Sequence, residues 1–233
     1  MNKFTLNFQN LSHAMLSRLV DLHGHLLPGF VPQLVSHYAE LETHRARMSY
    51  NTGSISLSAG VFLFMVCNTF KPKVVVEVGT FLGKSTTAMA LGMSWNDSTE
   101  RHIYTCDKDN PCLLAASIGP VRIHPHSGQT STEMFRHLVS QGVKADILSL
   151  DGRLTAEDLP LLSDLCHSET VVLLDDFEGI EKGVVNYQAL MSLLPNYLFM
   201  PPVMSSRLQA FGVVDPHCTA MLMPTSLLAI TRQ

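Results

Sequence analysis

Charged residues are scarce in this sequence, and neither sign dominates. They make up 15% of the 233 residues, and the formal net charge at pH 7 is -4. The densest basic group, Arg45-Ala46-Arg47, is short and is typical of a solvated helix face. Because proteins that bind nucleic acid present a basic patch or stripe, this charge distribution argues against a nucleic-acid partner.

Cysteine is also scarce, and its spacing argues against a cross-linked or zinc-bound protein. The five cysteines are an odd number and contain no C-x-x-C pair: Cys67, Cys106, Cys112, Cys166 and Cys218. An odd number of cysteines without such pairs, several of them inside apolar runs, is not typical of a disulfide framework or a zinc site. We therefore expect reduced thiols, most of them buried.

Long hydrophobic runs are missing as well. The longest, from Val61 to Cys67, is much shorter than the roughly 20 residues that a transmembrane helix needs. The segment from Met1 to Asn7 lacks the apolar stretch of a secretion signal. We therefore expect no membrane partner and a cytoplasmic location.

The sequence does contain enough apolar residues, 46%, for one sizeable buried core. Between residues 10 and 48 they recur at helical spacing, and Gly24 and Pro28 interrupt the pattern. This predicts an N-terminal helical cap over residues 1–50, ahead of a main domain over residues 51–233. A further buried helix is expected at 58–68.

From residue 73 onward, β-branched runs alternate with helical patterns. Strands are expected at 73–78, 102–107, 121–124, 145–151, 170–174, 196–200 and 226–231, and helices at 84–93 and 181–194. This alternation predicts an α/β protein with a Rossmann-like, doubly wound, mostly parallel sheet of seven strands and helices on both faces.

Acidic residues follow several of the expected strands. Asp107 ends the second strand, Asp151 ends the fourth, and Asp175 and Asp176 end the fifth. In doubly wound sheets, ligands bind beyond the carboxyl ends of the strands. Four carboxylates at one edge would repel one another without a ligand or a cation, so we expect a binding site there.

The turn after the first strand, Glu77-Val78-Gly79-Thr80-Phe81-Leu82-Gly83-Lys84-Ser85, is typical of a loop that a ligand approaches closely. It does not contain the G-x-G-x-x-G pattern of dinucleotide-binding enzymes. Gly83-Lys84-Ser85, with Asp175-Asp176, matches part of a P-loop NTPase or kinase. However, only three residues separate the two glycines, where that loop has four. This alternative stays open.

The same turn resembles the first motif of class I S-adenosylmethionine (SAM)-dependent methyltransferases, E-x-G-x-x-x-G-x-S. From about residue 50 onward, the chain is similar to the catechol O-methyltransferase-like group, and residues 51–60 resemble the loop that closes over the cofactor. The resemblance implies that SAM is bound by Glu77, Gly79, Thr80, Phe81, Gly83, Ser85, Asp107, Lys108, Gly128, Gln129 and Asp151. The Asp107 carboxylate would accept hydrogen bonds from both ribose hydroxyls.

The resemblance further implies a divalent cation, Mg²⁺ or another, held by Asp151, Asp175 and Asp176, where the group has Asp, Asp and Asn. Related methyltransferases without metal also carry acids here, so the metal requirement stays open. The lysine base of that group is absent. Arg153 stands near its place and cannot take a proton, although it can orient an anionic substrate. His126 is a candidate base, and Asp151 completes the predicted catalytic set.

These features together predict a SAM-dependent methyltransferase that acts on a small-molecule acceptor, with a hydroxyl group as the expected nucleophile. A phenol, a sugar hydroxyl, a carboxylate or an amine all remain open as acceptors. Besides the P-loop alternative, a non-catalytic cofactor-binding protein also fits the sequence. The apolar N-terminal helices are candidates for pairing in a homodimer.

Overall fold

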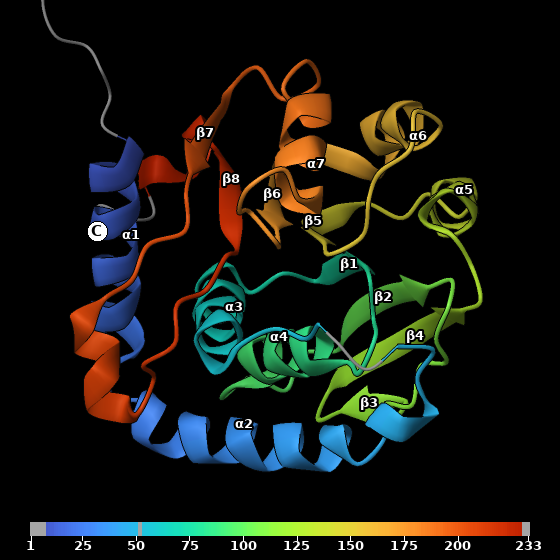
Figure 1. Ribbon diagram of the computed structural model, residues 1–233. Helices are drawn as coiled ribbons and strands as arrows, with labels where there is room; N and C mark the ends of the chain where they lie inside the picture. The colour runs from blue at the N-terminus through green and yellow to red at the C-terminus, as the bar shows by residue number, and fades with distance from the viewer. Residues whose placement is uncertain (1–7, 51–52, 230–233) are drawn as a thin grey trace, which may run out of the picture.

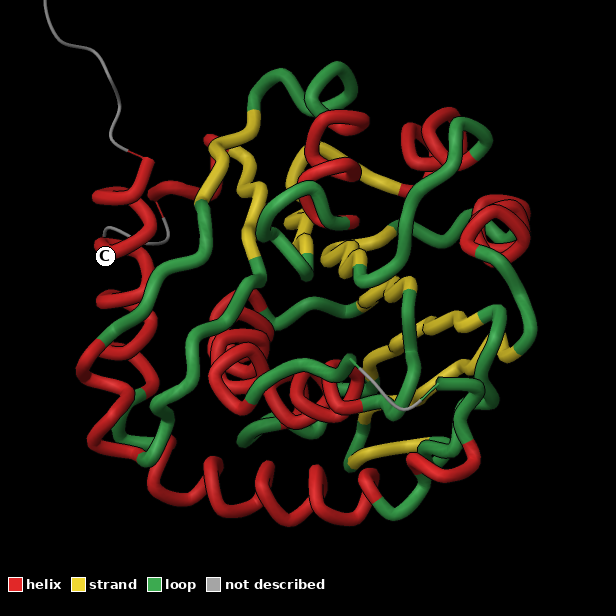
Figure 2. Tube along the Cα trace, in the orientation of Figure 1, coloured by secondary structure: helices red, strands yellow, loops and turns green. Residues whose placement is uncertain are grey.

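The structure, a computed structural model, describes residues 8–50 and 53–229, and helices and strands alternate along most of them (Figures 1 and 2). The helices are α1 (Phe8–His23), α2 (Leu27–Glu42), α3 (Leu57–Phe70), α4 (Lys84–Ser94), α5 (Ser131–Ser140), α6 (Asp158–Leu165) and α7 (Lys182–Leu190). The strands are β1 (Val74–Val78), β2 (Arg101–Asp107), β3 (Ser117–Ile118), β4 (Val121–Ser127), β5 (Ala145–Leu150), β6 (Cys166–Leu174), β7 (Tyr197–Met200) and β8 (Ala220–Pro224).

The strands form one twisted sheet in the order β3-β4-β2-β1-β5-β6-β8-β7. The five central strands β4, β2, β1, β5 and β6 are parallel. β8 is antiparallel to β6 and to β7. The predicted doubly wound, mostly parallel sheet is therefore confirmed. It has eight strands in place of the expected seven because the two-residue β3 adds an antiparallel edge that is too short to show a periodicity.

The last strand lies earlier in the chain than predicted. Residues Thr225–Ala229 form a 3₁₀ helix, η3, and the strand is β8, which has the sequence AMLMP. This segment carries no β-branched residue, so its composition gave no strand signal. Its pairing with β6, where Met221 lies opposite Leu173, buries all five of its residues. Residues 230–231 of the predicted strand lie outside the described residues.

Two helices that the sequence analysis did not predict, α5 and α6, cover the sheet together with α7. Helix α5 begins at a capping box, in which the side chains of Thr130 and Glu133 each accept a hydrogen bond from the other residue's backbone N–H. These three helices bury one apolar cluster against the sheet. A second cluster lies on the other face, under α3 and α4. Helices therefore cover both faces (Figure 1).

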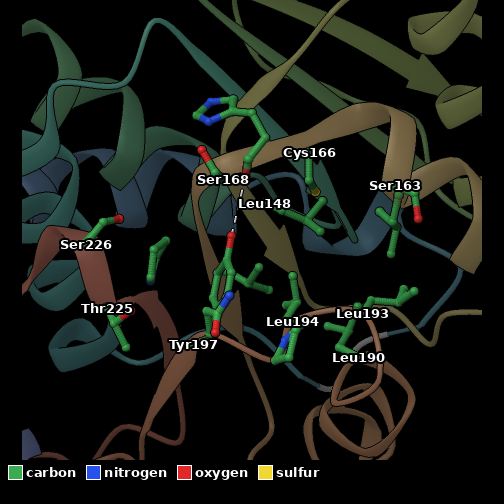
Figure 3. Close-up of a pocket in the computed structure, with 16 residues that line it drawn as sticks. Leu148, Ser163, Cys166, Ser168, Leu190, Leu193, Leu194, Tyr197, Thr225 and Ser226 are labelled. Carbon is green, nitrogen blue, oxygen red and sulfur yellow. Dashed lines mark hydrogen bonds between the residues drawn. The ribbon is translucent and has the colours of Figure 1, made fainter.

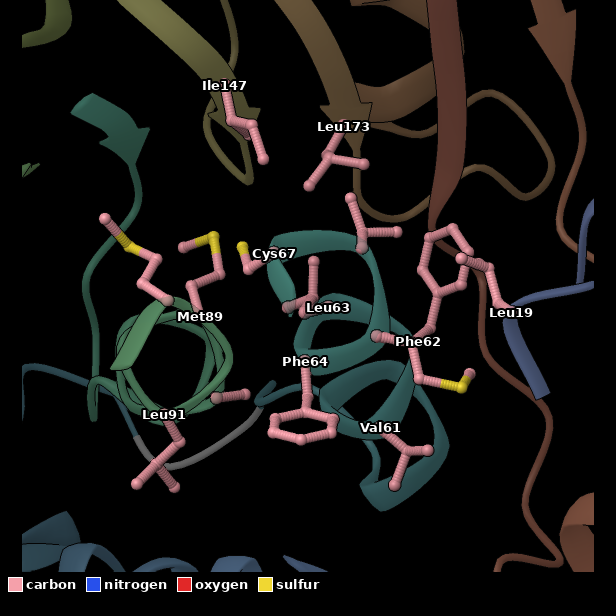
Figure 4. Close-up of a cluster of buried hydrophobic side chains, with 14 of the residues drawn as sticks. Leu19, Val61, Phe62, Leu63, Phe64, Cys67, Met89, Leu91, Ile147 and Leu173 are labelled. Carbon is pink, nitrogen blue, oxygen red and sulfur yellow. The ribbon is translucent and has the colours of Figure 1, made fainter. Parts of the chain in front are cut away.

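Helix α3 lies inside a three-layer arrangement. Its residues 58–67 are all buried, and a helix that is apolar on every side must be covered on every side. Figure 4 shows Leu63, Cys67 and the neighbouring Met89 of α4 facing Ile147 and Leu173 of the sheet. The helices α1 and α2 pack on the opposite side of α3. No helix in the described part of the chain is long and apolar enough to cross a membrane.

The predicted N-terminal helices are present, and their apolar side chains face the protein's own core. Leu19 of α1 and Leu34 of α2 are almost fully buried. Pro28 lies in the first turn of α2, where its missing N–H costs no hydrogen bond. The homodimer and the division at residues 50 and 51 stay predictions. The cysteines are free thiols, but only Cys67 and Cys106 are buried and the other three are partly exposed, so the expectation that most would be buried is wrong.

Candidate functional site

The strand order reverses at β1, which has β2 on one side and β5 on the other. Gly79 follows β1 directly and has a φ of +100°, a conformation that favours glycine. A Cβ atom at Gly79 would lie 3.0 Å from the carbonyl carbon and oxygen of Asp151. The ends of β1 and β5 therefore approach so closely that a side chain at Gly79 would be crowded as well as strained. This crevice is where ligands bind in doubly wound folds.

Glu77, one residue before the end of β1, is fully buried. Its carboxylate accepts hydrogen bonds from the hydroxyls of Ser85 at 2.6 Å, Thr86 at 2.5 Å and Thr105 at 2.6 Å. Burial raises the pKa of Glu77, and the three hydroxyl groups oppose this effect. Glu77 and Ser85 thus join β1, β2 and the start of α4 beneath the glycine turn. Their predicted contact with a cofactor stays a prediction.

Asp107 holds the glycine turn against the end of β2. Its Oδ2 accepts a hydrogen bond from the Phe81 backbone N–H at 2.9 Å, and its Oδ1 accepts from the N–H groups of Asp109 and Asn110, both at 2.9 Å. Phe81 has a φ of +43°, which is unfavourable for a bulky residue. The carboxylate therefore stabilises an unusual turn. Its bond to a ribose stays a prediction.

A cavity of about 270 Å³ opens beside this turn. The cavity is lined by segments before β1, by the glycine turn, by residues that follow β5 and β6, and by residues that precede β8. These residues are Tyr50, Gly53, Ser54, Ile55, Ser56, Ala59, Gly79, Phe81, Asp151, Asp175, Asp176, Glu178, Lys182, Pro216 and Cys218. The structure thus brings together five predicted residues from three strand ends. The Tyr50 ring stacks on Phe81 with 4.6 Å between centroids. Asn51 and Thr52 of the predicted closing loop lie outside the described residues.

The carboxylates in this cavity have a cation among them. The Lys182 Nζ lies 2.5 Å from Asp151 Oδ1 and 3.1 Å from Asp176 Oδ2. Asp175 instead accepts a hydrogen bond from the Thr219 hydroxyl at 2.6 Å. Burial, and then the neighbouring Asp175, raise the pKa of Asp151 to about 8. Burial lowers the pKa of Lys182, but Asp151 and Asp176 outweigh it and hold that pKa above its usual value.

This donor set does not fit the divalent cation that the resemblance implies. The Lys182 ammonium already contacts two of the three predicted ligands. In the described residues, the acidic groups whose ligand atoms lie within 4.8 Å of one another are Asp175, Asp176 and Cys218, without Asp151. Mg²⁺ prefers oxygen ligands, and the Cys218 sulfur is a poor ligand for it.

The structure places the remaining predicted residues outside this cavity. His126 and Gln129 bond to each other at 2.9 Å and line a separate hollow with Glu133 and His137. Arg153 is exposed and is absent from the cavity lining. Other predicted cofactor residues flank the turn: Lys108 lies exposed beside Asp109, the Gly128 N–H donates to the Asp107 carbonyl, and Thr80 bonds to Thr105.

Lys182 and Tyr50 also line the cavity, and neither is among the residues predicted from the sequence. Lys182 stands in the first turn of α7. A cation there opposes the helix dipole. The positive charge of Lys182 and its position shortly after Asp175-Asp176 were the sequence features that could have indicated a role in the site. Tyr50 directly precedes the predicted loop, and no sequence feature indicated a role for it.

A larger cavity, of about 570 Å³, lies at the opposite edge of the sheet, where β6 and β7 begin (Figure 3). Leucines such as Leu190, Leu193 and Leu194 line it, and the Tyr197 hydroxyl donates to the His167 carbonyl at 3.4 Å. None of the four strand-end carboxylates is part of its lining. The smaller cavity, which has the charged groups and the glycine turn, is therefore the candidate active site.

Comparisons with known proteins agree on the fold. No family model and no curated protein matches the chain. Among solved structures, the O-methyltransferase TomG from Streptomyces achromogenes, in complex with SAM, is 16% identical, with 82% of this chain and 89% of that one covered and a TM-score of 0.55. The SAH-bound methyltransferase PaMTH1 from Podospora anserina is 16% identical, with 82% and 87% covered and a TM-score of 0.55.

A third structure, the O-methyltransferase from Bacillus cereus in complex with SAH, is 15% identical, with 84% of this chain and 89% of that one covered and a TM-score of 0.50. These similarities extend over most of each chain. The chain therefore has the fold of these methyltransferases.

Proposed function

We propose that this chain is a SAM-dependent methyltransferase that transfers a methyl group to a hydroxyl oxygen of a small molecule. The observation that carries the proposal is the glycine turn at the β1 switch point, held to β2 by the Asp107 carboxylate. Structures with this fold include O-methyltransferases in complex with SAM or its demethylated product SAH. The oxygen nucleophile rests on those relatives.

The cofactor supplies a methyl group on a positively charged sulfur. The acceptor oxygen forms a bond to the methyl carbon, and the carbon–sulfur electron pair returns to sulfur, which becomes a neutral thioether. The chain must align the two reactants and accept the hydroxyl proton. Asp151 lines the cavity, and we assign it as the group that accepts this proton. Its pKa of about 8 suits transfer near neutral pH.

The P-loop alternative conflicts with the geometry of the turn. In P-loop proteins, the backbone N–H groups of the loop and the following lysine face the phosphates. Here the Phe81 N–H donates to Asp107, and a carboxylate at that place would repel a phosphate. The Lys84 Nζ lies 2.5 Å from Glu42 Oε1 on α2, so its charge is already paired.

The test is a calorimetric titration of the full chain with SAH and, separately, with ATP. We expect saturable SAH binding and no ATP binding. Asp107→Ala should weaken SAH binding by at least about tenfold, because it removes both the turn's anchor and the acceptor for the ribose. The matched control is Asp109→Ala, which changes an exposed acid two residues away and should leave the affinity unchanged.

Activity is then measured with labelled SAM on a panel of phenols, sugars and carboxylic acids. A wild-type chain that binds ATP and not SAH would overturn the proposal. A chain that binds SAH and methylates none of the panel would be a cofactor-binding protein without this activity. Asp107→Asn removes the charge and keeps the shape of the side chain. This variant therefore checks that a loss of SAH binding does not come from unfolding.

A further inference from the structure

The Lys182 ammonium lies between carboxylates that come from different strands. Asp151 directly follows β5 and Asp176 follows β6, and the Lys182 Nζ contacts one oxygen of each, at 2.5 and 3.1 Å. The Lys182 side chain is only 28% exposed, so solvent screens these contacts incompletely. A lysine ammonium has three N–H donors, and these two carboxylates accept two of them. The third is left for a ligand in the cavity that Lys182 lines.

Two neighbours on α7 hold Lys182 in this place. A Cβ atom at Gly183 would lie 2.3 Å from the Asp175 carbonyl oxygen, so glycine lets the start of α7 approach the end of β6. One turn later, Asn186 is fully buried. Its Oδ1 accepts from the Leu154 N–H at 2.9 Å, and its Nδ2 donates to the Gly152 carbonyl at 2.8 Å. Asn186 thereby fastens α7 to the loop that follows Asp151.

Asp176 is also held in an unusual conformation, with a φ of +50°. Non-glycine residues in this region carry a conformational cost that is common at functional sites. A lysine in the first turn of a helix is unfavourable for that helix because the dipole is positive there. The positive φ of Asp176 and the position of Lys182 in the first turn of α7 do not contribute to the stability of that helix. Together they bring one cation and two carboxylates to one point of the cavity.

We propose that the Lys182 ammonium is the built-in cation of this site, that it takes the place of a divalent metal, and that it binds the acceptor oxygen directly. The inference rests on the proposed methyltransferase function. A divalent cation at Asp151 and Asp176 would lie within a few ångströms of the ammonium, where the repulsion between the two charges opposes metal binding. The reaction is therefore independent of metal.

In the transfer step, the third N–H of Lys182 donates a hydrogen bond to the acceptor oxygen. Negative charge develops on this oxygen as its proton moves to Asp151, and the ammonium stabilises that charge while it keeps its own protons. The oxygen then forms the bond to the methyl carbon as the carbon–sulfur bond breaks. After product leaves, Asp151 releases the proton to solvent.

The direct test uses Mn²⁺ alone as a probe, followed by electron paramagnetic resonance on the full chain. The wild-type protein should show no saturable Mn²⁺ binding up to millimolar concentration. The Lys182→Ala chain should gain a Mn²⁺ site whose affinity is at least about tenfold higher than that of the wild-type chain, because removing the ammonium leaves three carboxylates unneutralised. Adding Asp176→Asn to that variant should remove the new site. Lys144→Ala, which changes an exposed lysine beside α6, should behave as wild type.

Saturable Mn²⁺ binding by the wild-type chain that Asp176→Asn removes would overturn the inference. A folded Lys182→Ala chain that gains no site would also count against it. Lys182→Gln provides a second variant, without the charge and with hydrogen-bonding capacity, if the alanine variant does not fold. The Mn²⁺ titration of the wild-type chain tests the inference without depending on the folding of any variant.

Turnover gives an independent readout on a phenol that the wild-type chain methylates. EDTA should leave the rate unchanged. Lys182→Gln should lower kcat by about 100-fold with SAH affinity unaltered, and Lys182→Arg should restore part of the rate. If the wild-type chain does not bind SAH, the proposed function is wrong. If the chain binds SAH and loses activity in EDTA, only the inference about Lys182 is wrong.

Discussion

Glu77 shows how one side chain prepares the glycine turn without reaching the cavity. It has no exposed surface, and hydroxyls from the start of α4 and from β2 donate to its two oxygens. Charge-assisted hydrogen bonds to a buried carboxylate are stronger than neutral ones. Removing the carboxylate would take this acceptor from the hydroxyls of Ser85 and Thr86, whereas Thr105 would keep the Thr80 hydroxyl as a partner.

Glu77→Ala should therefore lower the free energy of unfolding by at least about 3 kcal/mol, from unsatisfied hydroxyls and from the cavity that is left. Urea denaturation followed by circular dichroism measures this change. Glu169→Ala, at an exposed position on β6, should stay within about 0.5 kcal/mol of wild type. Equal effects of the two substitutions would contradict the structural role of Glu77.

Helix α1 is attached to α3 through a histidine that must remain neutral. Asn68 Nδ2 donates to His23 Nδ1 at 2.9 Å, and Thr69 Oγ1 lies 2.8 Å from His23 Nε2. The amide of Asn68 cannot turn around, because its Oδ1 accepts from Lys71 Nζ at 2.5 Å. A proton on His23 Nδ1 would thus replace an acceptor with a donor. Burial, and then the charges of His25 and Lys71, lower the pKa of His23 from 6.5 to about 4.

This attachment predicts acid sensitivity. Between pH 6.5 and about 4, the unfolded state binds a proton that the folded state excludes, so stability falls as the pH drops through this window and levels off below it. His23 should account for up to about 3 kcal/mol of the loss. Thermal melts of wild type and His23→Gln at a series of pH values measure the difference. His13→Gln, at an exposed position on α1, should show the full wild-type pH dependence.

At the scale of the whole molecule, the N-terminal helices share a core with the sheet. The Phe30 ring of α2 stacks on Phe64 of α3 with 3.6 Å between centroids. Both rings lie nearly perpendicular to the ring of Trp95, with centroids 5.9 and 5.4 Å from its centroid. Trp95 is the single tryptophan of the chain, so its fluorescence reports on the contact between these layers.

Unfolding should therefore be one cooperative transition. Trp95 fluorescence, which follows the N-terminal layers, and circular dichroism, which follows the whole chain, should give the same midpoint in urea. Phe30→Ala should lower both midpoints together, at a cost of about 3–5 kcal/mol. A fluorescence transition that precedes the circular dichroism transition would show that residues 1–50 unfold as a separate unit.

Local patterns in the sequence were sufficient for most of the central sheet. Short strand-like runs that end at Gly79, Asp107 or Asp151 predicted β1, β2 and β5, because strand propensity and turn chemistry act over a few residues. The edge elements were less predictable. The two-residue β3 is too short for a period, and β8 becomes a strand through its pairing with β6.

The sequence by itself therefore determined the glycine turn, the strand-end carboxylates and the class of fold that brings them to one edge. Only the tertiary structure decided which groups meet there. It places His126 in a separate hollow and Arg153 at the surface, and it brings Lys182 between Asp151 and Asp176. The physical reason is that these contacts join segments far apart in the chain. Strand order and the docking of α7 through Gly183 and Asn186 set their distances, and neither is encoded in local spacing.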